Sequence, residues 1–296
     1  MTLEIRRNPL LAERTTLRLG GTALAEAVLR DDADLDAVAR LLEAEGGAPL
    51  RLGWGSNLLA RDGELPLVLL KVDNATGPVV DEGPEHVTVR TGAGLGMPVL
   101  LAKMQQAGLA GLERLAGIPG SVGGAAAMNA GSYGAEFGAL LRRVRLWTPE
   151  RGLFWKDAAE CTFGYRHFDP GLSGLWLVWE VELRLARKSP DAIKDVMRET
   201  MRRKSSTQPV TAHSAGCLFR NPEGQSAGRL LDEAGFRGRR IGNMAFSELH
   251  ANFLVNIREM GVPSRSEDAL ELIALAREAV LKRFDIALEM EVVVVP

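Results

Sequence analysis

The most informative stretch of this chain is GIPGSVGGAAAMNAGSYG, which occupies residues 117–134. It carries almost no bulky side chains, so its backbone N–H groups can come close to an anion. The side chains of Ser121, Asn129 and Ser132 add further hydrogen-bonding groups. This composition fits a site for a diphosphate, and it fits equally a glycine-rich loop that packs between two layers of a fold. The segment therefore predicts either a nucleotide site or a packing loop.

A second small, polar turn, GWGSNLL at residues 53–59, follows a predicted strand. It suits a phosphate or a ribityl group, although its composition alone favours an ordinary turn. Neither this turn nor GAGLG at residues 92–96 completes the G-x-G-x-x-G fingerprint of a Rossmann fold, because Leu58 and Val99 occupy the last glycine position. A nucleotide would therefore have to bind without the standard dinucleotide fingerprint.

Composition excludes several other classes of protein. The 296 residues, with 46% hydrophobic and 25% charged side chains, describe a globular chain of about two domains, at roughly 150 residues per domain. The net charge of −2 gives no electrostatic footprint for nucleic acid. The four histidines and two cysteines have no metal-ligand spacing. The N-terminus lacks the apolar core of a signal peptide, and no stretch approaches the roughly 20 apolar residues of a membrane span. We therefore expect a cytoplasmic protein with no metal and no nucleic-acid or membrane partner.

Hydrophobic periodicity predicts strands and helices in alternation, which favours an α/β or α+β fold. Strands are expected at residues 49–52, 65–72, 86–90, 142–147, 175–185 and 287–295. Helices are expected at residues 33–46, 97–106 and 226–234, after Pro190 as far as the basic run 202–204, and from a capping box at Ser264–Glu267. The best candidate for a domain boundary is Lys188-Ser189-Pro190.

Three further segments carry candidate chemistry. On the last predicted strand, Glu289 and Glu291 share one face and Leu288, Met290, Val292 and Val294 share the other. The carboxylates fit either a solvent-facing edge or a cleft. Cys217, in SAGCLFRNP, is either a small buried hydrophobe or a proton donor whose pKa is lowered by a nearby arginine. Arg166, in FGYRH, is either a surface arginine or a group that polarises a substrate carboxylate.

Taken in order along the chain, these segments resemble a bacterial flavoprotein family, the UDP-N-acetylenolpyruvoylglucosamine reductases. The resemblance covers nearly the whole chain, and the segments together are far more specific than any one of them. It rests on TTLRLGG (15–21), GWGSNLL (53–59), AGIPGSVGG (116–124), MNAGSYG (128–134), FGYR (163–166), SAGCLFRNP (214–222), SELHANFLVN (247–256) and LEMEV (288–292).

The resemblance implies an α+β fold with an FAD-binding domain of the vanillyl-alcohol-oxidase (PCMH) type. This domain is expected at residues 1–188, in two subdomains of about 1–72 and 73–188, and a smaller C-terminal α+β substrate-binding domain is expected at 189–296. Only about ten residues separate Arg166 from the strand at residue 175. The chain therefore resembles the shorter subtype, which lacks an extra loop with a tyrosine that contacts the substrate.

The implied activity is the NADPH-dependent reduction of UDP-N-acetylglucosamine enolpyruvate to UDP-N-acetylmuramate through FAD, in the synthesis of peptidoglycan precursors for the cell wall. A hydride passes from reduced flavin N5 to C3 of the enolpyruvyl group, and Arg166 and Glu291 stabilise the enolate. Cys217 then protonates C2, at a position where family members usually carry serine. Glu289 takes the place of Glu291 if the register of the last strand differs by two.

The resemblance also carries over binding residues and a monomeric state. The expected FAD contacts are Gly53, Gly55, Ser56, Asn57, Leu58, Gly117, Pro119, Gly120, Ser121, Gly123, Gly124, Asn129, Gly131 and Tyr133. The expected contacts with the UDP-sugar are Tyr165, Asn221 and His250. The basic run 202–204 fits a contact with the UDP phosphates or, somewhat better, a solvated helix end. Arg220 and Phe168 depart from the family pattern, where lysine and serine are usual.

Two other functions are compatible with parts of this pattern. One is a flavin oxidase with the same type of FAD domain that acts on another small molecule and is reoxidised by oxygen. It leaves the Cys217 segment and the C-terminal glutamates unexplained. The other is a nucleotide-binding module that has lost catalysis, which would follow if Cys217 had replaced a required proton donor.

Overall fold

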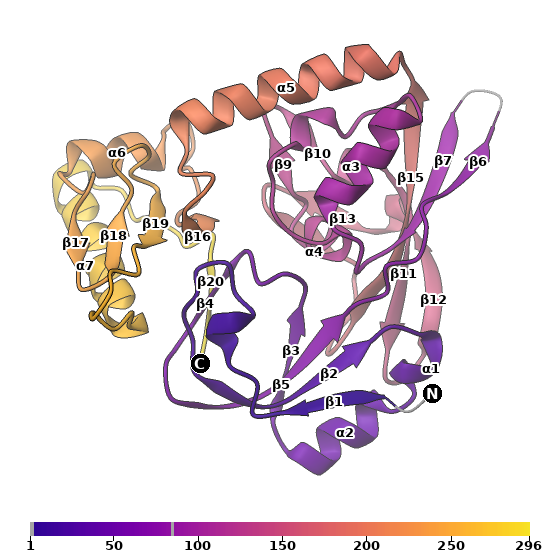
Figure 1. Cartoon of the computed structure of the whole chain (residues 1–296), viewed down its shortest axis with the longest axis horizontal. Coiled ribbons are helices and arrows are strands. Elements are labelled where there is room, and N and C mark those ends of the chain that lie inside the picture. Colours follow the sequence, from indigo (N-terminus) through magenta and orange to yellow (C-terminus); the bar gives the residue numbers. More distant parts are fainter. Residues whose placement is uncertain (1–2, 84–85) are drawn as a thin grey trace. The chain divides into compact units, whose positions relative to one another are not determined.

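The computed structural model describes residues 3–83 and 86–296 of the chain (Figure 1). The trace divides into two compact units, each assembled from separate stretches of sequence. Unit 1 contains the residues up to Arg7, Ala25–Trp54 and Leu67–Arg203, and unit 2 contains Asn8–Leu24, Gly55–Pro66 and Lys204–Pro296. Each unit therefore depends on residues from both halves of the sequence. The predicted domain boundary at residue 188 stays a prediction.

Unit 1 is built around an antiparallel sheet of six strands. In spatial order they are β12 (Gly152–Asp157), β11 (Leu141–Thr148), β15 (Leu177–Arg187), β7 (Val87–Gly92) and β6 (Val79–Glu82), and β8 (Leu109–Ala110) pairs with β15. On β15, Val181, Leu183 and Leu185 alternate into the core and are at most 1% exposed. The strands predicted from apolar alternation in this region are confirmed.

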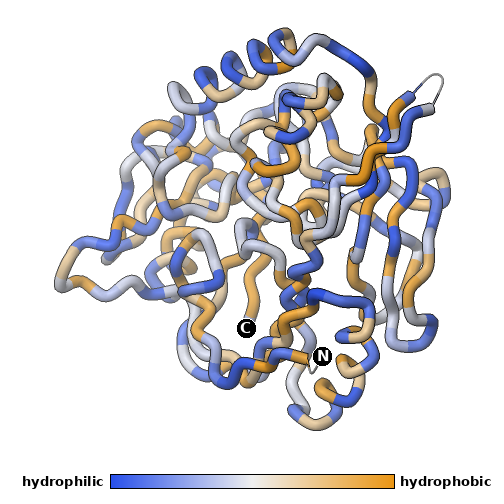
Figure 2. Tube along the Cα trace, turned by 45° about the vertical axis from the view of Figure 1, so that its right-hand side comes forward, coloured by the Kyte–Doolittle hydropathy of each residue, from blue (hydrophilic) through white to orange (hydrophobic). Residues whose placement is uncertain are grey.

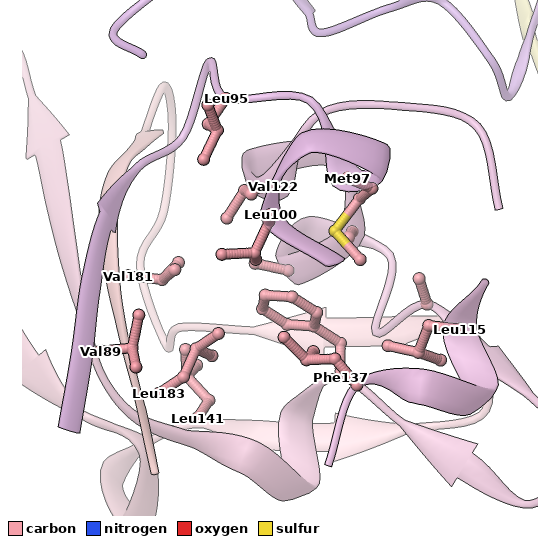
Figure 3. Packing of buried hydrophobic residues seen from close by; sticks show 14 of the residues in the cluster. Val89, Leu95, Met97, Leu100, Leu115, Val122, Phe137, Leu141, Val181 and Leu183 are labelled. Carbon is pink, nitrogen blue, oxygen red and sulfur yellow. The ribbon is translucent and has the colours of Figure 1, made fainter. Parts of the chain in front are cut away.

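One face of this sheet packs against helices α3 (Met97–Gln106) and α4 (Val122–Ala127). The bounds of α3 are those predicted, and Pro98 in its first turn favours a helix start. Figure 3 shows Phe137 in the middle of the shared core, beneath Met97 and Leu100 of α3 and beside Leu115. Because Phe137 is fully buried, the loop that follows the glycine-rich segment is fixed to the core.

A second sheet has the strand order β1 (Glu4–Arg7), β2 (Thr22–Leu29), β5 (Glu64–Val72) and β3 (Ala48–Leu52). The helix predicted at 33–46 is present as two pieces, α1 (Asp32–Leu35) and α2 (Val38–Glu45). The interruption follows from Asp34, whose carboxylate accepts the backbone N–H groups of Arg30 and Asp31 while its carbonyl accepts from Ala37. The predicted apolar face still packs inward, with Leu35 and Val38 at most 1% exposed.

Unit 2 contains an antiparallel sheet with the order β16 (His213–Cys217), β19 (Phe253–Asn256), β18 (Met244–Phe246) and β17 (Arg240–Ile241). Helices α6 (Ala227–Glu233) and α7 (Ser266–Phe284) pack on its core. Ser226 caps α6 and Gly235 follows it at φ +82°, as predicted. Strand β4 (Leu58–Ala60) pairs in parallel with β20 (Val293–Val295).

Two predictions about the C-terminal region are wrong. Helix α7 begins at Ser266 rather than at a Ser264–Glu267 capping box, because the Ser264 hydroxyl donates to Asn256 Oδ1 and the Ser266 N–H donates to Asp62. The last strand is shorter than predicted, and its buried face differs from the predicted one. Val294, predicted to share a face with Val292, is 38% exposed, whereas Val295 is 4% exposed. The difference has a local cause, since the N–H groups of both Glu291 and Val292 donate to the Leu218 carbonyl.

The remaining elements are short, except for helix α5. They are α5 (Pro190–Thr207), the hairpins β9 (Gly131–Ser132) with β10 (Ala135–Glu136) and β13 (Thr162–Gly164) with β14 (His167–Asp169), and the 3₁₀ turns Leu11–Glu13, Glu113–Leu115, Gly138–Leu140 and Ala158–Glu160. Figure 2 shows how hydrophobic and hydrophilic residues alternate along the trace. The predicted apolar face of α5 is confirmed at Ile193 and Thr200, whereas Met201 is 37% exposed.

Candidate functional site

The glycine-rich segment of unit 1 lies against the turn that follows β3. A Cβ added to Gly53 would sit 2.6 Å from the Ser121 Oγ, so this approach requires glycine. The Lys71 Nζ donates to the Gly53 carbonyl and fixes the turn from the neighbouring strand. Gly117 and Gly120 have φ values of +80° and +134°, which residues other than glycine rarely adopt. The two segments singled out by composition therefore meet in space at these residues.

This part of unit 1 has backbone donors that suit an anion. Gly120 and Ser121 are buried, and their N–H groups have no acceptor among the residues that the structure describes. A buried N–H group without a partner is costly, so such donors are typical of a place where a ligand completes the hydrogen bonds. A diphosphate, with its many acceptor oxygens, fits this pair. These two donors favour the nucleotide-site interpretation of the segment over the packing loop.

In unit 2, the rest of the turn connects to the end of the chain. Gly55 has φ +63°, and a Cβ there would sit 2.1 Å from the Arg14 carbonyl oxygen. The Asn57 side-chain amide donates to the Glu291 carbonyl at 3.1 Å, and the Asn57 backbone carbonyl accepts the Val293 N–H at 3.0 Å. The turn predicted to bind a cofactor and the strand predicted to carry the active carboxylate therefore belong to one hydrogen-bonded arrangement.

Cys217 and Glu291 lie on neighbouring segments of unit 2. The Leu218 carbonyl accepts the Glu291 N–H at 2.9 Å, and the Arg220 N–H donates to the Glu289 carbonyl at 2.9 Å. The two segments thus run antiparallel, with Phe219 opposite Met290. Cys217 and Glu291 are both half-buried, whereas Glu289 is exposed. This difference in burial favours Glu291 over Glu289 as a carboxylate that works in a shielded site.

Asn252 is a residue of this region that the sequence reasoning did not single out. It is 2% exposed, its side chain donates to the Phe219 carbonyl and accepts the Phe219 N–H, and its carbonyl accepts the Leu218 N–H. It therefore fixes the backbone directly after Cys217. The only signal in the sequence was a polar residue at the start of an apolar run in HANFLVN. Lys71, a lysine near the end of the apolar strand β5, gave a signal of the same kind in unit 1.

The two predicted sugar-binding residues of unit 2 are oriented by backbone groups near α6. The Asn221 Oδ1 accepts the Ala227 N–H at 3.0 Å, which leaves its amide N–H groups as donors. The His250 Nδ1 accepts the Asn252 N–H at 3.2 Å, so the neutral ring carries its proton on Nε2. Burial and the nearby Arg237 guanidinium lower the pKa of the His250 imidazole, which favours this neutral form.

Arg166 lies at the tip of the β13–β14 hairpin of unit 1. Its φ of +54° is unusual for a residue with a side chain and indicates that the turn is held by its surroundings. The Arg166 Nη2 donates to the Gly131 carbonyl at 3.0 Å, and the guanidinium carbon lies 5.1 Å from the centre of the Tyr165 ring. Tyr165 and Tyr133 are 45% and 40% exposed, each in a hairpin turn. The guanidinium of Arg166, which the sequence singled out, is therefore held in place by its contacts with Gly131 and Tyr165.

The basic run at the end of α5 is not a uniformly solvated helix end. Arg202 and Arg203 both pair with Glu199, and their side chains are 70% and 60% exposed. Lys204 is only 4% exposed, so the solvated interpretation is wrong for this residue. The two arginines hold the pKa of Glu199 at about 2 through hydrogen bonds.

The predicted site residues separate into two groups. Unit 1 contains Gly53, the segment 117–133, Tyr165 and Arg166, and unit 2 contains Gly55–Leu58, Cys217, Asn221, His250 and Glu291. Within residues 3–83 and 86–296, no group of three or more His, Cys, Asp or Glu side chains is arranged to hold a metal ion. In the same ranges, the helices are all too short or too polar to span a bilayer.

Comparisons with known proteins identify the family of the chain. Residues 208–295 match the family model described as UDP-N-acetylenolpyruvoylglucosamine reductase, C-terminal domain, and residues 23–155 match the model described as FAD binding domain. The UDP-N-acetylenolpyruvoylglucosamine reductase of Nitratidesulfovibrio vulgaris is 51% identical over 293 residues, covering 98% of this chain and 98% of that protein. The reductase of Oleidesulfovibrio alaskensis is 50% identical, with 97% of each chain covered.

A solved structure extends the comparison to three dimensions. The crystal structure of UDP-N-acetylenolpyruvylglucosamine reductase from Thermus caldophilus matches with a TM-score of 0.82 at 34% identity, covering 99% of this chain and 100% of that chain. Together with the two family models, this similarity confirms the predicted α+β fold class of an FAD-binding domain and a C-terminal domain.

Proposed function

This chain belongs to the UDP-N-acetylenolpyruvoylglucosamine reductase family, and from this premise we propose that it reduces UDP-N-acetylglucosamine enolpyruvate to UDP-N-acetylmuramate with NADPH. The observation that carries the proposal is the 51% identity to one such reductase over 98% of both chains. The product is a precursor of peptidoglycan, so the activity belongs to cell-wall synthesis. A cytoplasmic location and a monomeric state are part of the proposal.

FAD is the cofactor, and its diphosphate fits the two buried N–H donors of Gly120 and Ser121. When bound, FAD would supply the transfer of a hydride from NADPH to the enolpyruvyl group. The residues proposed to hold FAD are Gly53, Gly55, Ser56, Asn57, Leu58, Gly117, Pro119, Gly120, Ser121, Gly123, Gly124, Gly131 and Tyr133. The side chain of Asn129 is used within the protein, and its contribution is argued in the next subsection.

Arg166 and Glu291 are proposed to stabilise the negative charge that develops on the enolpyruvyl carboxylate. A guanidinium offers paired N–H donors that match a carboxylate, and the contact of Arg166 with the Gly131 carbonyl limits the positions it can take. Glu291 is proposed to help by donating a hydrogen bond to this charge from its half-buried position. Tyr165, Asn221 and His250 are proposed to contact the UDP-sugar, with the Asn221 amide as a donor.

Cys217 is proposed to donate the proton that C2 of the substrate receives. A thiol is more acidic than the serine hydroxyl that the family usually carries, so the substitution preserves a proton donor. The support for this role is the position of Cys217 at the end of β16, beside the segment that carries Glu291. The backbone after Cys217 is fixed by Asn252, which limits the movement of the donor.

The test is an anaerobic titration of the purified protein, followed by its visible spectrum. Yellow protein that bleaches with NADPH and regains its colour only with the enolpyruvyl sugar supports the reductase. Colour that returns only with oxygen supports an oxidase acting on another small molecule. Colourless protein that cannot be reconstituted with FAD contradicts both enzymes and supports a binding module without catalysis.

A further inference from the structure

Two hairpins of unit 1 are joined through one buried side chain. Asn129 precedes the β9–β10 hairpin, is 1% exposed, and donates from Nδ2 to the Gly164 carbonyl at 2.9 Å and to the Glu136 carboxylate at 3.1 Å. Its Oδ1 accepts the Gly138 N–H at 2.8 Å. Both amide donors of Asn129 are thus used by protein acceptors, which leaves none for a ligand.

The contact between the hairpins is reciprocal. Asn129 donates to Gly164, two residues before Arg166, and Arg166 donates to the carbonyl of Gly131, two residues after Asn129. A Cβ on Gly131 would sit 3.1 Å from the Arg166 Nη1, so the guanidinium lies directly against this backbone. Each hairpin therefore supplies one side-chain donor and one backbone acceptor to the other.

The local backbone shows that this arrangement is strongly constrained. Asn129 and Arg166 have φ values of +40° and +54°, conformations that cost free energy for residues with side chains. A Cβ on Gly138 would sit 2.8 Å from the Asn129 Oδ1 and 2.5 Å from Phe163, so the surrounding chain leaves the Asn129 side chain little room to move. Phe163 and Phe168, on the two strands of the Arg166 hairpin, contact each other with ring centres 5.2 Å apart.

We propose that Asn129 is a positioning residue, which fixes the Arg166 hairpin so that the guanidinium is held where the substrate carboxylate binds. The inference rests on the proposed function, because it assumes that Arg166 acts on the enolpyruvyl group. It differs from the expectation that Asn129 contacts FAD. The effect of Asn129 on the reaction with the enolpyruvyl sugar then depends on Arg166. Once the guanidinium has been removed, removing the Asn129 side chain should have little further effect on that reaction.

The test is a double-mutant cycle on the FAD-loaded enzyme, read in stopped flow. Asn129→Gly removes the side chain and tolerates the positive φ, and Asn129→Asp keeps the acceptor for Gly138 but loses both donors. We expect each to retain FAD and its reduction by NADPH, and to slow reoxidation by the enolpyruvyl sugar by about 10- to 100-fold. In an Arg166→Ala background, the same changes should slow reoxidation by less than about twofold further.

Asn74 supplies a matched control, because it is a buried asparagine of unit 1 that donates to the Trp179 carbonyl and accepts from Thr76. Asn74→Ala should lower the melting temperature, and any effect on reoxidation should combine additively with that of Arg166→Ala. Additive effects of Asn129→Gly and Arg166→Ala, or weaker FAD binding in the Asn129 variants, would overturn the positioning role. If Arg166→Ala alone leaves reoxidation unchanged, the proposed role of Arg166 fails first, and that of Asn129 fails with it. If Asn129→Gly does not fold, Asn129→Asp decides by the same criteria.

Discussion

Cys217 is the proposed catalytic residue that differs most from the family pattern, because it places a thiol where a serine hydroxyl is usual. We expect Cys217→Ser to keep reoxidation by the enolpyruvyl sugar within about tenfold, because the hydroxyl is also a proton donor. Cys217→Ala should lose about 10²- to 10⁴-fold, the usual contribution of a general acid. Stopped-flow reoxidation measures both. An Ala variant as fast as the parent would show that the proton comes from elsewhere.

The pKa of His250 makes a prediction about stability against pH. Burial lowers the pKa of this imidazole in the folded protein, whereas the unfolded chain keeps an ordinary value near 6.5. The unfolded state therefore binds the proton first, and the stability contributed by His250 is complete above about pH 6.5 and falls as the pH drops towards the folded pKa. Urea unfolding from pH 8 to pH 5 should show a shallower loss for His250→Gln than for the parent. An equal loss of stability with falling pH in the two proteins would contradict this contribution of His250.

Substitution of two glycines by alanine can distinguish the free energy lost to a strained backbone from that lost to a steric clash. Gly55 and Gly46 have similar φ values, +63° and +66°, but a Cβ on Gly55 meets the Arg14 carbonyl at 2.1 Å whereas Gly46 has open space. Gly46→Ala should cost about 1–2 kcal/mol for the left-handed backbone alone. Gly55→Ala should cost about 1–3 kcal/mol more, because its neighbours have to move. Chemical denaturation of both variants measures the difference, and equal losses would exclude the clash.

Among the elements, the segment after β16 depends on a single asparagine. Asn252→Ala removes the partners of the Phe219 N–H and carbonyl, which are both buried. We expect the free energy of unfolding to fall by about 2–6 kcal/mol, at roughly 1–3 kcal/mol for each of the two unsatisfied groups. Asn221→Ala, which removes an exposed partner of one helix N–H, should cost about 1 kcal/mol. Urea unfolding compares the two, and an Asn252 variant no worse than the Asn221 variant would show that water replaces the lost partners.

The accuracy of the sequence predictions also differs from element to element. Local signals were sufficient for α3, where Pro98 and apolar spacing coincide, and for α6, where Ser226 caps the helix and Gly235 follows it. They failed at α7 and at the last strand, because Asp62 and Leu218, distant in sequence, take the hydrogen bonds there. The sequence singled out Arg166 and Cys217, but not Asn252, because its hydrogen bonds to distant backbone leave no periodic pattern.

For the whole molecule, the FAD cofactor should be part of the stability as well as the chemistry. A ligand that binds only the folded protein adds RT ln(1 + [L]/Kd) to the free energy of unfolding, about 2.7 kcal/mol at 100 times Kd. We therefore expect the apoprotein to melt at a lower temperature, and the melting temperature to rise with added FAD. Differential scanning fluorimetry of apoprotein with FAD, and with riboflavin as a ligand that lacks the diphosphate, measures this. A rise of equal size with riboflavin would argue against the diphosphate site at Gly120 and Ser121.

The parallel pairing of β4 with β20 joins residues 58–60 to residues 293–295, across nearly the whole chain. During translation, the ribosome synthesises residues 58–60 long before residues 293–295. The large sheet of unit 1 has all its strands once Arg187 has been added. The Gly55–Leu58 turn, by contrast, lacks its neighbouring strand until Val295 has been made. Translation itself therefore delays the completion of this turn. A nascent chain halted before residue 293 contains every strand of the unit 1 sheet but lacks the strand that pairs with residues 58–60.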